Sequence, residues 1–210
     1  MRGAPRFASR RSVFLSAPAA AWRRRTFIDA REIPHVRRAV FFDRDGIVNE
    51  RIVGGYVRSV RELVLIDAIL DVLSLVHERG YRSVLVSNQQ GVGKGLMTAE
   101  HLQEVTDHMQ QELMRRCGVA FDDIRYCTDL DSAGSPRRKP APGMLLEAAE
   151  EAGIDLPASW MIGDSVSDAK AGRAAGVRTI LVGDHGTVAE ADWIEPSVAD
   201  VLPVLRAHLH

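Results

Sequence analysis

Short apolar runs recur along the chain from residue 39 onward. Five runs of three or four residues are mostly apolar, rich in β-branched or aromatic side chains, and bounded by turn residues; they are 39–42, 83–86, 124–127, 160–162 and 179–182. Runs of this kind are typical of strands that are buried on both faces of a parallel sheet. The pattern therefore predicts five buried strands.

The segments between these runs carry apolar residues at helical spacing. One such segment runs from Ile69 to Val76 and ends before Gly80, and another lies between Thr98, a predicted N-cap, and Gly118. Apolar spacings of three and four predict amphipathic helices, and glycine is common just past a helix end. The alternation predicts an α/β fold, namely a doubly wound, three-layer, Rossmann-like domain with a mostly parallel five-strand sheet.

The first 38 residues differ from the rest of the chain in charge. They hold ten Arg and two acidic residues, whereas the remaining residues hold 17 basic and 26 acidic ones, so the two parts carry net charges of +8 and −9. The near-neutral total of −1 is therefore the sum of two unlike pieces. We expect residues 1–37 to be a basic, disordered extension and residues 38–210 to form one domain.

The N-terminal extension is open to three interpretations. Ser9-Arg10-Arg11 followed by a short apolar stretch resembles a twin-arginine export signal, and the Arg-rich, acid-poor composition also suits an organelle transit peptide. Because Ser16 and Pro18 interrupt the apolar stretch, we favour a disordered arm, which a start codon assigned too far upstream would also produce. The arm lacks the interleaved aromatics and dense basic spacing of nucleic-acid-binding segments, so no nucleic-acid partner is expected.

Composition excludes several classes of protein. With 46% hydrophobic and 26% charged residues, the chain is neither collagen-like nor an intrinsically disordered or coiled-coil sequence. Its two cysteines cannot form a disulfide framework, so we expect a reducing compartment and a cytoplasmic location. No apolar run approaches the roughly 20 residues needed to span a bilayer, so no membrane partner is expected. We also expect a monomer.

Polar residues suited to catalysis follow four of the five predicted strands. In parallel α/β sheets, ligands bind outside the carboxyl ends of the strands, where such residues converge. Each group alone can have a purely structural role as a turn, a cap or a solvated charge, but together the four groups predict one crevice. The four groups are Asp43-Arg44-Asp45-Gly46, Ser87-Asn88-Gln89, Arg138-Lys139-Pro140, and Gly163-Asp164 with Asp168 one helical turn later.

The residue types in these groups suit phosphoryl transfer to an aspartate. A carboxylate such as Asp43 can attack phosphorus and form an acyl phosphate that water later hydrolyses. Asp43 and Asp164 are hard oxygen donors suited to Mg²⁺, while Lys139 and Ser87 can bind phosphoryl oxygens. Asp45, two residues after Asp43, can protonate the leaving oxygen and later deprotonate the attacking water.

The four groups resemble the four motifs of the haloacid dehalogenase superfamily of phosphohydrolases, over about residues 38–205. Finer features are similar to the D-glycero-D-manno-heptose 1,7-bisphosphate phosphatases, and histidinol-phosphate phosphatases share much of the same pattern. These features are Asp-Arg-Asp-Gly with Asn49, then Gly55-Tyr56-Val57, Ser87-Asn88-Gln89-Gln90-Gly91, and Arg138-Lys139-Pro140-Ala141-Pro142-Gly143-Met144.

The resemblance implies an Mg²⁺-dependent phosphomonoester hydrolase that acts through an aspartyl-phosphate intermediate and lacks a large cap domain. It implies Asp43 as nucleophile and Asp45 as general acid and base, with Asp43, the Asp45 carbonyl and Asp164 as metal ligands. The expected substrate is a heptose 1,7-bisphosphate that loses its 7-phosphate, with histidinol phosphate or another small phosphomonoester as the alternative. The implied substrate- or phosphate-binding residues are Arg44, Asn49, Ser87, Asn88, Arg138 and Lys139.

One loop departs from the pattern of both subgroups. Their members commonly carry a zinc loop with three Cys and one His between the third strand and the Arg-Lys-Pro motif. Here residues 127–137 offer Cys127 alone and no His, and Cys117 cannot make up the deficit. Because a structural zinc site needs four such ligands, we predict that zinc is absent.

Two other functions, nucleotide binding and phospho-receiver signalling, are less well supported by the residues. The glycine-rich segment 91–95 lacks the spacing of a P-loop and of a dinucleotide fingerprint, although Lys94 within it is a candidate contact for a second substrate phosphate. Phospho-receiver signalling modules also place acidic residues at strand ends, but they accept phosphate on the third strand, which here ends in Cys127. Asp45 favours a phosphatase over a receiver, because an acid/base partner serves dephosphorylation.

Overall fold

The computed structural model describes residues 37–210. The predicted basic extension, residues 1–37, lies outside the described residues except for Arg37. The backbone of Arg37 already pairs with the domain, because its carbonyl accepts a hydrogen bond from Asp155 N at 2.8 Å and its N–H donates to Gly153 O at 3.3 Å.

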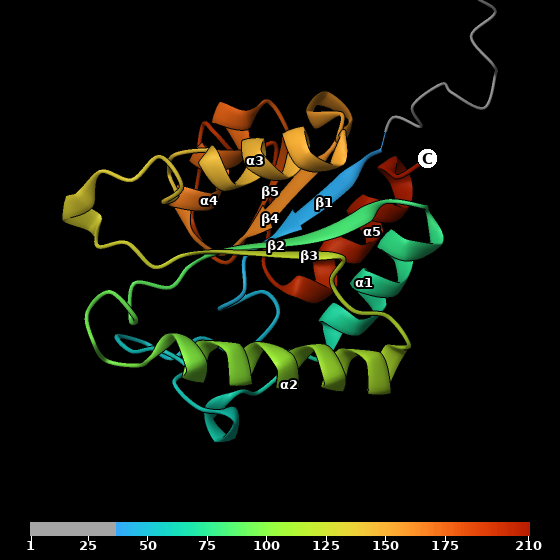
Figure 1. The fold of residues 1–210 in the computed structure, drawn as a ribbon. Coiled ribbons are helices and arrows are strands. Elements are labelled where there is room, and N and C mark those ends of the chain that lie inside the picture. The colour runs from blue at the N-terminus through green and yellow to red at the C-terminus, as the bar shows by residue number, and fades with distance from the viewer. Residues whose placement is uncertain (1–36) are drawn as a thin grey trace, which may run out of the picture. The chain divides into compact units, whose positions relative to one another are not determined.

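Six parallel strands form one sheet in the order β3-β2-β1-β4-β5-β6 (Figure 1). The five predicted strands are all present, which confirms the doubly wound α/β fold, and a sixth short strand extends the sheet beyond β5. The strands are β1 (Ala39–Phe42), β2 (Arg82–Asn88), β3 (Asp123–Cys127), β4 (Trp160–Gly163), β5 (Arg178–Val182) and β6 (Trp193–Glu195).

Helices cover both faces of this sheet. In residues 37–210 they are α1 (Ala68–Glu78), α2 (Ala99–Cys117), α3 (Gly143–Ala152), α4 (Val166–Ala175) and α5 (Val198–His208). One apolar cluster joins α1, α2 and α5 to Val40 and Phe42, and a second joins α3 and α4 to Phe41 and Met161. Successive strand residues point to opposite faces, so the all-apolar run in β1 serves both clusters. None of these helices is long and apolar enough to cross a membrane.

The predicted helix boundaries have the expected local chemistry. The Thr98 hydroxyl accepts a hydrogen bond from His101 N at 3.2 Å and so caps the start of α2. The same helix ends at Gly118, whose φ of 75° is the left-handed conformation that glycine adopts without steric cost. Helix α2 therefore has the limits that its sequence predicts.

The centre of the sheet brings the predicted site residues together. Strand β1 lies between β2 and β4, and the register pairs Phe42 with Leu85 on one side and with Ile162 on the other. The segments that leave β1, β2 and β4 therefore start beside one another, at the switch point where doubly wound sheets bind ligands. Residues 43–67, between β1 and α1, contain loops and the short 3-10 helix η1 (Val60–Glu62), in keeping with the expectation of no large cap domain.

Candidate active site

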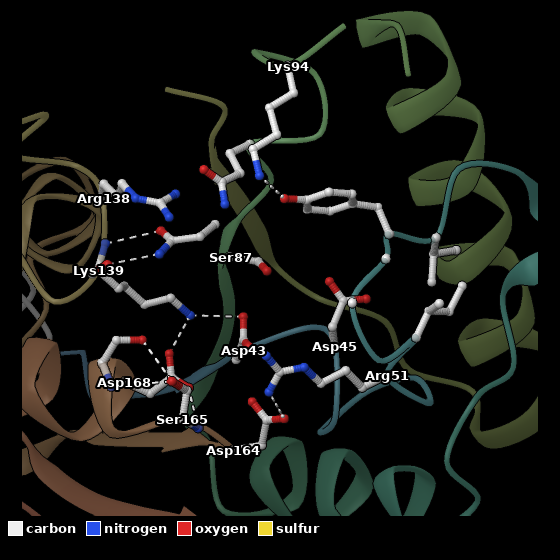
Figure 2. A pocket seen from close by; sticks show the side chains of 18 of the residues that line it. Asp43, Asp45, Arg51, Ser87, Lys94, Arg138, Lys139, Asp164, Ser165 and Asp168 are labelled. Carbon is white, nitrogen blue, oxygen red and sulfur yellow. Dashed lines mark hydrogen bonds and ion pairs between the residues drawn. The ribbon is translucent and has the colours of Figure 1, made fainter. Parts of the chain in front are cut away.

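A pocket of about 490 Å³ opens at the carboxyl ends of β1, β2 and β4 (Figure 2). Most of the residues that the sequence singles out line it. These residues are Asp43, Asp45, Ser87, Asn88, Arg138, Lys139, Asp164 and Asp168. The four groups at strand ends therefore do converge on one crevice.

Lys139 lies at the bottom of the pocket between two carboxylates. Its Nζ is 2.8 Å from Asp43 Oδ1 and 2.6 Å from Asp168 Oδ1, and it donates to the carbonyl of Val86 at 2.7 Å. Burial alone would lower the pKa of Lys139, but the charges of Asp168 and Asp43 outweigh burial and raise that pKa above its ordinary value. Lys139 is therefore a permanent positive charge against the two carboxylates.

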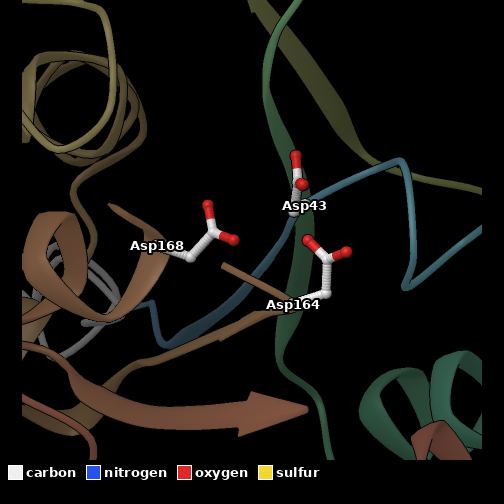
Figure 3. A group of neighbouring side chains, drawn as sticks. All are labelled: Asp43, Asp164 and Asp168. Atoms are coloured by element: carbon white, nitrogen blue, oxygen red, sulfur yellow. The ribbon is translucent and has the colours of Figure 1, made fainter. Parts of the chain in front are cut away.

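Three carboxylates form the acidic floor of the pocket (Figure 3). Asp43, Asp164 and Asp168 each place an oxygen within 4.8 Å of the others. Burial and the neighbouring Asp43 raise the pKa of Asp164 above its ordinary value, although the guanidinium of Arg51 opposes the shift. Asp168 already has partners in Lys139 and in Ser165 N, so Asp43 and Asp164 are the better candidates to hold a cation.

Two glycines allow these carboxylates to approach the strand ends. At Gly46, with a φ of 95°, a Cβ atom would lie 2.2 Å from Asp164 Oδ2. At Gly163, a Cβ atom would lie 2.2 Å from Asp168 Cβ. Any larger residue at either position would displace a carboxylate of the acidic floor, so both glycines shape the site.

Asp45 lines the pocket, and three buried side chains donate hydrogen bonds to its carboxylate. Arg44 Nη2 lies 3.0 Å from both of its carboxylate oxygens, Asn49 Nδ2 donates to Oδ1 at 2.9 Å, and Gln89 Nε2 donates to Oδ2 at 2.8 Å. Burial opposes ionisation of Asp45, but the Arg44 charge and these hydrogen bonds outweigh it and hold its pKa below the usual range. The side chain still keeps 22% of its surface exposed, so it can meet a ligand.

The predicted substrate contacts of Arg44 and Asn49 need correction. Both residues are fully buried, and neither lines the pocket. The buried Arg44 guanidinium also donates to Gln89 Oε1 at 3.1 Å and lies over the ring of Tyr126. Because both side chains are buried and donate to Asp45, we reassign them from binding substrate to holding that carboxylate.

Ser87 and Asn88, at the end of β2, have different surroundings. Ser87 is buried and borders the pocket, with its hydroxyl accepting a hydrogen bond from Gln89 at 3.1 Å. The Asn88 side chain bonds both backbone groups of Lys139, donating to its carbonyl at 2.9 Å and accepting from its N–H at 3.0 Å. Asn88 thereby fixes the loop that delivers Lys139 to the pocket.

The rim of the pocket is basic at Lys94 and Arg138, and beside the floor lies Arg51, a residue that sequence reasoning missed. Arg51 extends from the loop after β1 and lies 3.0 Å from Asp164 Oδ2, with 58% of its side chain exposed. Lys94 donates to the Tyr56 hydroxyl at 3.2 Å, which joins the glycine-rich loop to the loop after β1 (Figure 2). Arg51 lies between Asn49 and Gly55, but no motif or spacing distinguishes it from other arginines of the chain.

Residues 127–137 correspond to the zinc loop of the two subgroups that the sequence resembles, and they contain a buried cysteine. Cys127 Sγ lies 3.6 Å from Asp129 Oδ2 and 3.9 Å from Ser135 Oγ. Cys117 lies on α2, where its Sγ faces the Leu113 carbonyl of the same helix. The absence of zinc stays a prediction from the ligand count.

Comparison with known proteins identifies the family of the chain. The HAD-hydrolase-like family model matches residues 136–206, the segment that contains Lys139 and Asp164. The D-glycero-beta-D-manno-heptose-1,7-bisphosphate 7-phosphatase of Yersinia pestis is 37% identical over 182 residues, which cover 80% of this chain and 95% of the relative. The chain belongs to the haloacid dehalogenase-like phosphatases.

Two further matches support the assignment as a phosphatase. The D-glycero-alpha-D-manno-heptose-1,7-bisphosphate 7-phosphatase of Burkholderia mallei is 34% identical over 179 residues, covering 80% of this phosphatase and 93% of the relative. The solved structure of D,D-heptose 1,7-bisphosphate phosphatase from B. bronchiseptica, complexed with magnesium and phosphate, has a TM-score of 0.74 at 27% identity. That match covers 81% of this chain and 98% of the other.

Proposed function

We propose that this phosphatase hydrolyses the 7-phosphate of a D-glycero-D-manno-heptose 1,7-bisphosphate, with Mg²⁺ as cofactor and Asp43 as nucleophile. The observation that carries the proposal is one pocket with an acidic floor at Asp43 and Asp164 and a basic rim at Lys94 and Arg138. The floor suits a cation and the reacting phosphate, while the rim suits a second anionic group on the same small substrate.

The acidic floor fits a magnesium ion. Mg²⁺ prefers oxygen ligands and is held in proteins by one or two carboxylates together with water and phosphate oxygens. Asp43 and Asp164 would hold the ion, joined by the Asp45 carbonyl as in the resembling superfamily. The raised pKa of Asp164 reflects burial beside Asp43, a repulsion that a bound dication relieves. The ion would neutralise charge between the attacking carboxylate and the phosphoryl group.

The proposed first step is phosphoryl transfer to Asp43. A carboxylate oxygen of Asp43 forms a bond to phosphorus while the bond from phosphorus to the sugar oxygen breaks. Lys139 holds Oδ1 of Asp43 at 2.8 Å and so orients the carboxylate for attack. Ser87 binds a phosphoryl oxygen, and Asp45 gives a proton to the departing sugar oxygen.

The proposed second step hydrolyses the aspartyl phosphate. Asp45, now ionised, takes a proton from a water molecule that attacks phosphorus, and the bond to Asp43 breaks to release inorganic phosphate. The contacts that Arg44, Asn49 and Gln89 make to Asp45 favour this ionised form. The proton taken from water restores protonated Asp45, the form that the next transfer needs.

The basic rim supports a substrate with two phosphates. Lys94 stands on one loop at the pocket mouth and Arg138 on another, and both line the pocket. Within the described residues, the buried Arg138 Nη1 has no hydrogen-bond partner, although Arg138 Nε pairs with Asp131 Oδ1 at 3.1 Å. A donor without a partner beside the pocket suits an anionic group of the substrate.

A substrate screen with a rim variant tests the proposal. We expect Mg²⁺-dependent phosphate release to be fastest with one anomer of heptose 1,7-bisphosphate and slower with histidinol phosphate. Lys94→Met should raise KM for the bisphosphate about 10- to 100-fold, because a hydrogen bond to a charged group contributes roughly 1.5–3 kcal/mol. The KM for a sugar monophosphate should stay within about threefold.

Lys170→Met is the matched control, since Lys170 is an exposed lysine on α4 and does not line the pocket. Release from histidinol phosphate but from neither heptose bisphosphate would assign the alternative substrate. Equal effects of Lys94→Met on mono- and bisphosphates would remove Lys94 from the second phosphate site.

The predictions of a monomer, a cytoplasmic location and no zinc are tested by light scattering, cell fractionation and metal analysis of the full chain.

The glycine beside Asp164 gives a second test that does not depend on turnover. Gly46→Ala should weaken Mg²⁺ binding about 10- to 100-fold, the usual cost of disturbing residues that orient metal ligands, because its Cβ would displace Asp164. Isothermal titration of the protein with MgCl₂ alone measures the effect. Gly80→Ala is the control, since Gly80 has a similar φ of 71° but nothing within 4 Å of its Cβ position. Unchanged Mg²⁺ affinity in Gly46→Ala would exclude Asp164 as a ligand.

A further inference from the structure

Gln89 is a buried amide that joins the two groups proposed to act on the phosphate ester. Its Nε2 donates to Asp45 Oδ2 at 2.8 Å and to Ser87 Oγ at 3.1 Å, and its Oε1 accepts from Arg44 Nη2 at 3.1 Å. The residue is fully buried and does not line the pocket, so it reaches the substrate only through its neighbours. Its backbone N–H is anchored to the carbonyl of Cys127 at 2.7 Å.

The partners of Gln89 fix the orientation of its amide. A guanidinium offers only donors, and an ionised carboxylate offers only acceptors. The oxygen of the amide must therefore face Arg44, and the nitrogen must face Asp45. A flipped amide would set two donors against each other and two acceptors against each other, each inside a buried site where unpaired groups are costly.

This fixed amide has consequences for both neighbours. It donates to one oxygen of the Asp45 carboxylate, while Asn49 donates to the other at 2.9 Å. It also makes the Ser87 oxygen an acceptor, which leaves the hydroxyl hydrogen of Ser87 free to be donated elsewhere. Ser87 borders the pocket, so a phosphoryl oxygen can receive that hydrogen.

We infer that Gln89 is a positioning residue for proton transfer. It fixes the orientation of the Asp45 carboxylate for proton transfer to the leaving oxygen. The inference rests on the proposed function, in which Asp45 protonates the leaving group. The sequence places Gln89 in a polar group at a strand end, and the inference gives this residue a specific role in proton transfer.

Dependence on the leaving group separates this role from a general structural one. A sugar oxygen needs a proton in order to leave, whereas p-nitrophenolate leaves readily without one. We expect Gln89→Met to lower kcat/KM about 10- to 100-fold for the heptose bisphosphate and at most about threefold for p-nitrophenyl phosphate, since general acid catalysis contributes about 10²- to 10⁴-fold. The ratio kcat/KM is used because it covers steps through loss of the leaving group and excludes hydrolysis of the intermediate.

Asp45→Asn, measured with the same two substrates, distinguishes failure of the inference from failure of the proposed function. If Asp45→Asn lowers both values equally, Asp45 is not the general acid and the proposed function fails at that step. If Asp45→Asn is selective for the sugar substrate but Gln89→Met is not, the positioning role of Gln89 is overturned. In the double variant, we expect little loss beyond that of Asp45→Asn, because the two residues act as one unit.

Gln110→Met is the matched control for removing a glutamine that makes two hydrogen bonds. Gln110 donates to the Phe121 carbonyl at 2.9 Å and accepts from the Phe121 N–H at 3.0 Å, and it does not line the pocket. Its replacement should leave the ratio of the two kcat/KM values unchanged. Should Gln89→Met not fold, Gln89→Glu keeps the acceptor for Arg44 and removes the donor to Asp45, so the same selective loss is expected and its absence overturns the inference.

Discussion

Replacing Asp43 by Asn is expected to lower phosphate release by at least about 10⁴-fold, because the change removes the nucleophile while keeping the shape of the side chain. An amide is a poor nucleophile toward phosphorus. The variant also loses one of the two carboxylates that face Lys139, but the pair with Asp168 remains and should keep the lysine charged and buried. The loss therefore reports on chemistry and not on collapse of the pocket.

Trapping the intermediate makes this prediction specific to Asp43. Acid quenching of a reaction with ³²P-labelled substrate should leave label on the native enzyme, and more label on Asp45→Asn, in which hydrolysis of the aspartyl phosphate is slowed. Borohydride reduction should convert the phosphorylated residue to homoserine, which peptide mass spectrometry places at position 43. Asp71→Asn, an exposed site on α1, is the control and should retain native activity. Near-native turnover of Asp43→Asn, or label at another residue, would exclude the aspartyl-phosphate mechanism.

The strands of the fold were predictable because each has a local cause. A buried parallel strand needs consecutive apolar residues, and the five predicted runs coincide with β1 to β5. The expectation of burial was wrong for β3, which lies at a sheet edge and buries only Cys127. Strand β6 lacked that signal, because Trp193–Glu195 is three residues long and only half-buried at the sheet edge. An edge strand contacts the sheet on one side, so its sequence carries a weaker requirement for apolar residues.

The residues of the pocket floor were predictable for a similar reason. Asp43 and Asp164 directly follow strands that pair with each other, and parallel strands end at one edge. Arg44 was misassigned because sequence adjacency does not give the direction of a side chain. Between two aspartates that face the pocket, Arg44 points the other way, toward the ring of Tyr126, whose centroid lies 6.0 Å from its guanidinium carbon.

The contacts between distant segments could not be read from local patterns. Gln89 and Asp45 are 44 residues apart, and Arg51 and Asp164 are 113 residues apart. The sequence places Asp45, Gln89 and Asp164 in its motif groups, but only the packing of β1 against β2 and β4 shows which side chains meet. The parts of the site that hold and orient catalytic groups are therefore known from the structure alone.

Lys139→Met is expected to abolish turnover and to lower the free energy of unfolding by about 3–5 kcal/mol, the cost of removing one partner of a buried ion pair. Lys139 is only 3% exposed, and its charge faces both Asp43 and Asp168. Methionine fills a similar volume, so the loss arises from carboxylates left without a cation and not from a cavity. Equilibrium urea unfolding of the native protein and the variant, both in EDTA, measures the difference.

A second substitution identifies which carboxylate carries the cost. Asp168→Asn in the Lys139→Met background removes the buried carboxyl group that lies 2.6 Å from Lys139 Nζ in the native protein, so it should recover part of the lost stability. Asn at this position can still accept the hydrogen bond from Ser165 N. Lys170→Met on the surface of α4 should change stability by no more than about 0.5 kcal/mol. If Lys139→Met were as stable as the native protein, the ion pairs of Lys139 with Asp43 and Asp168 would contribute nothing net to the fold, because the cost of burying the charges would equal their attraction. The lysine would then serve the reaction alone, through its contact with the attacking carboxylate.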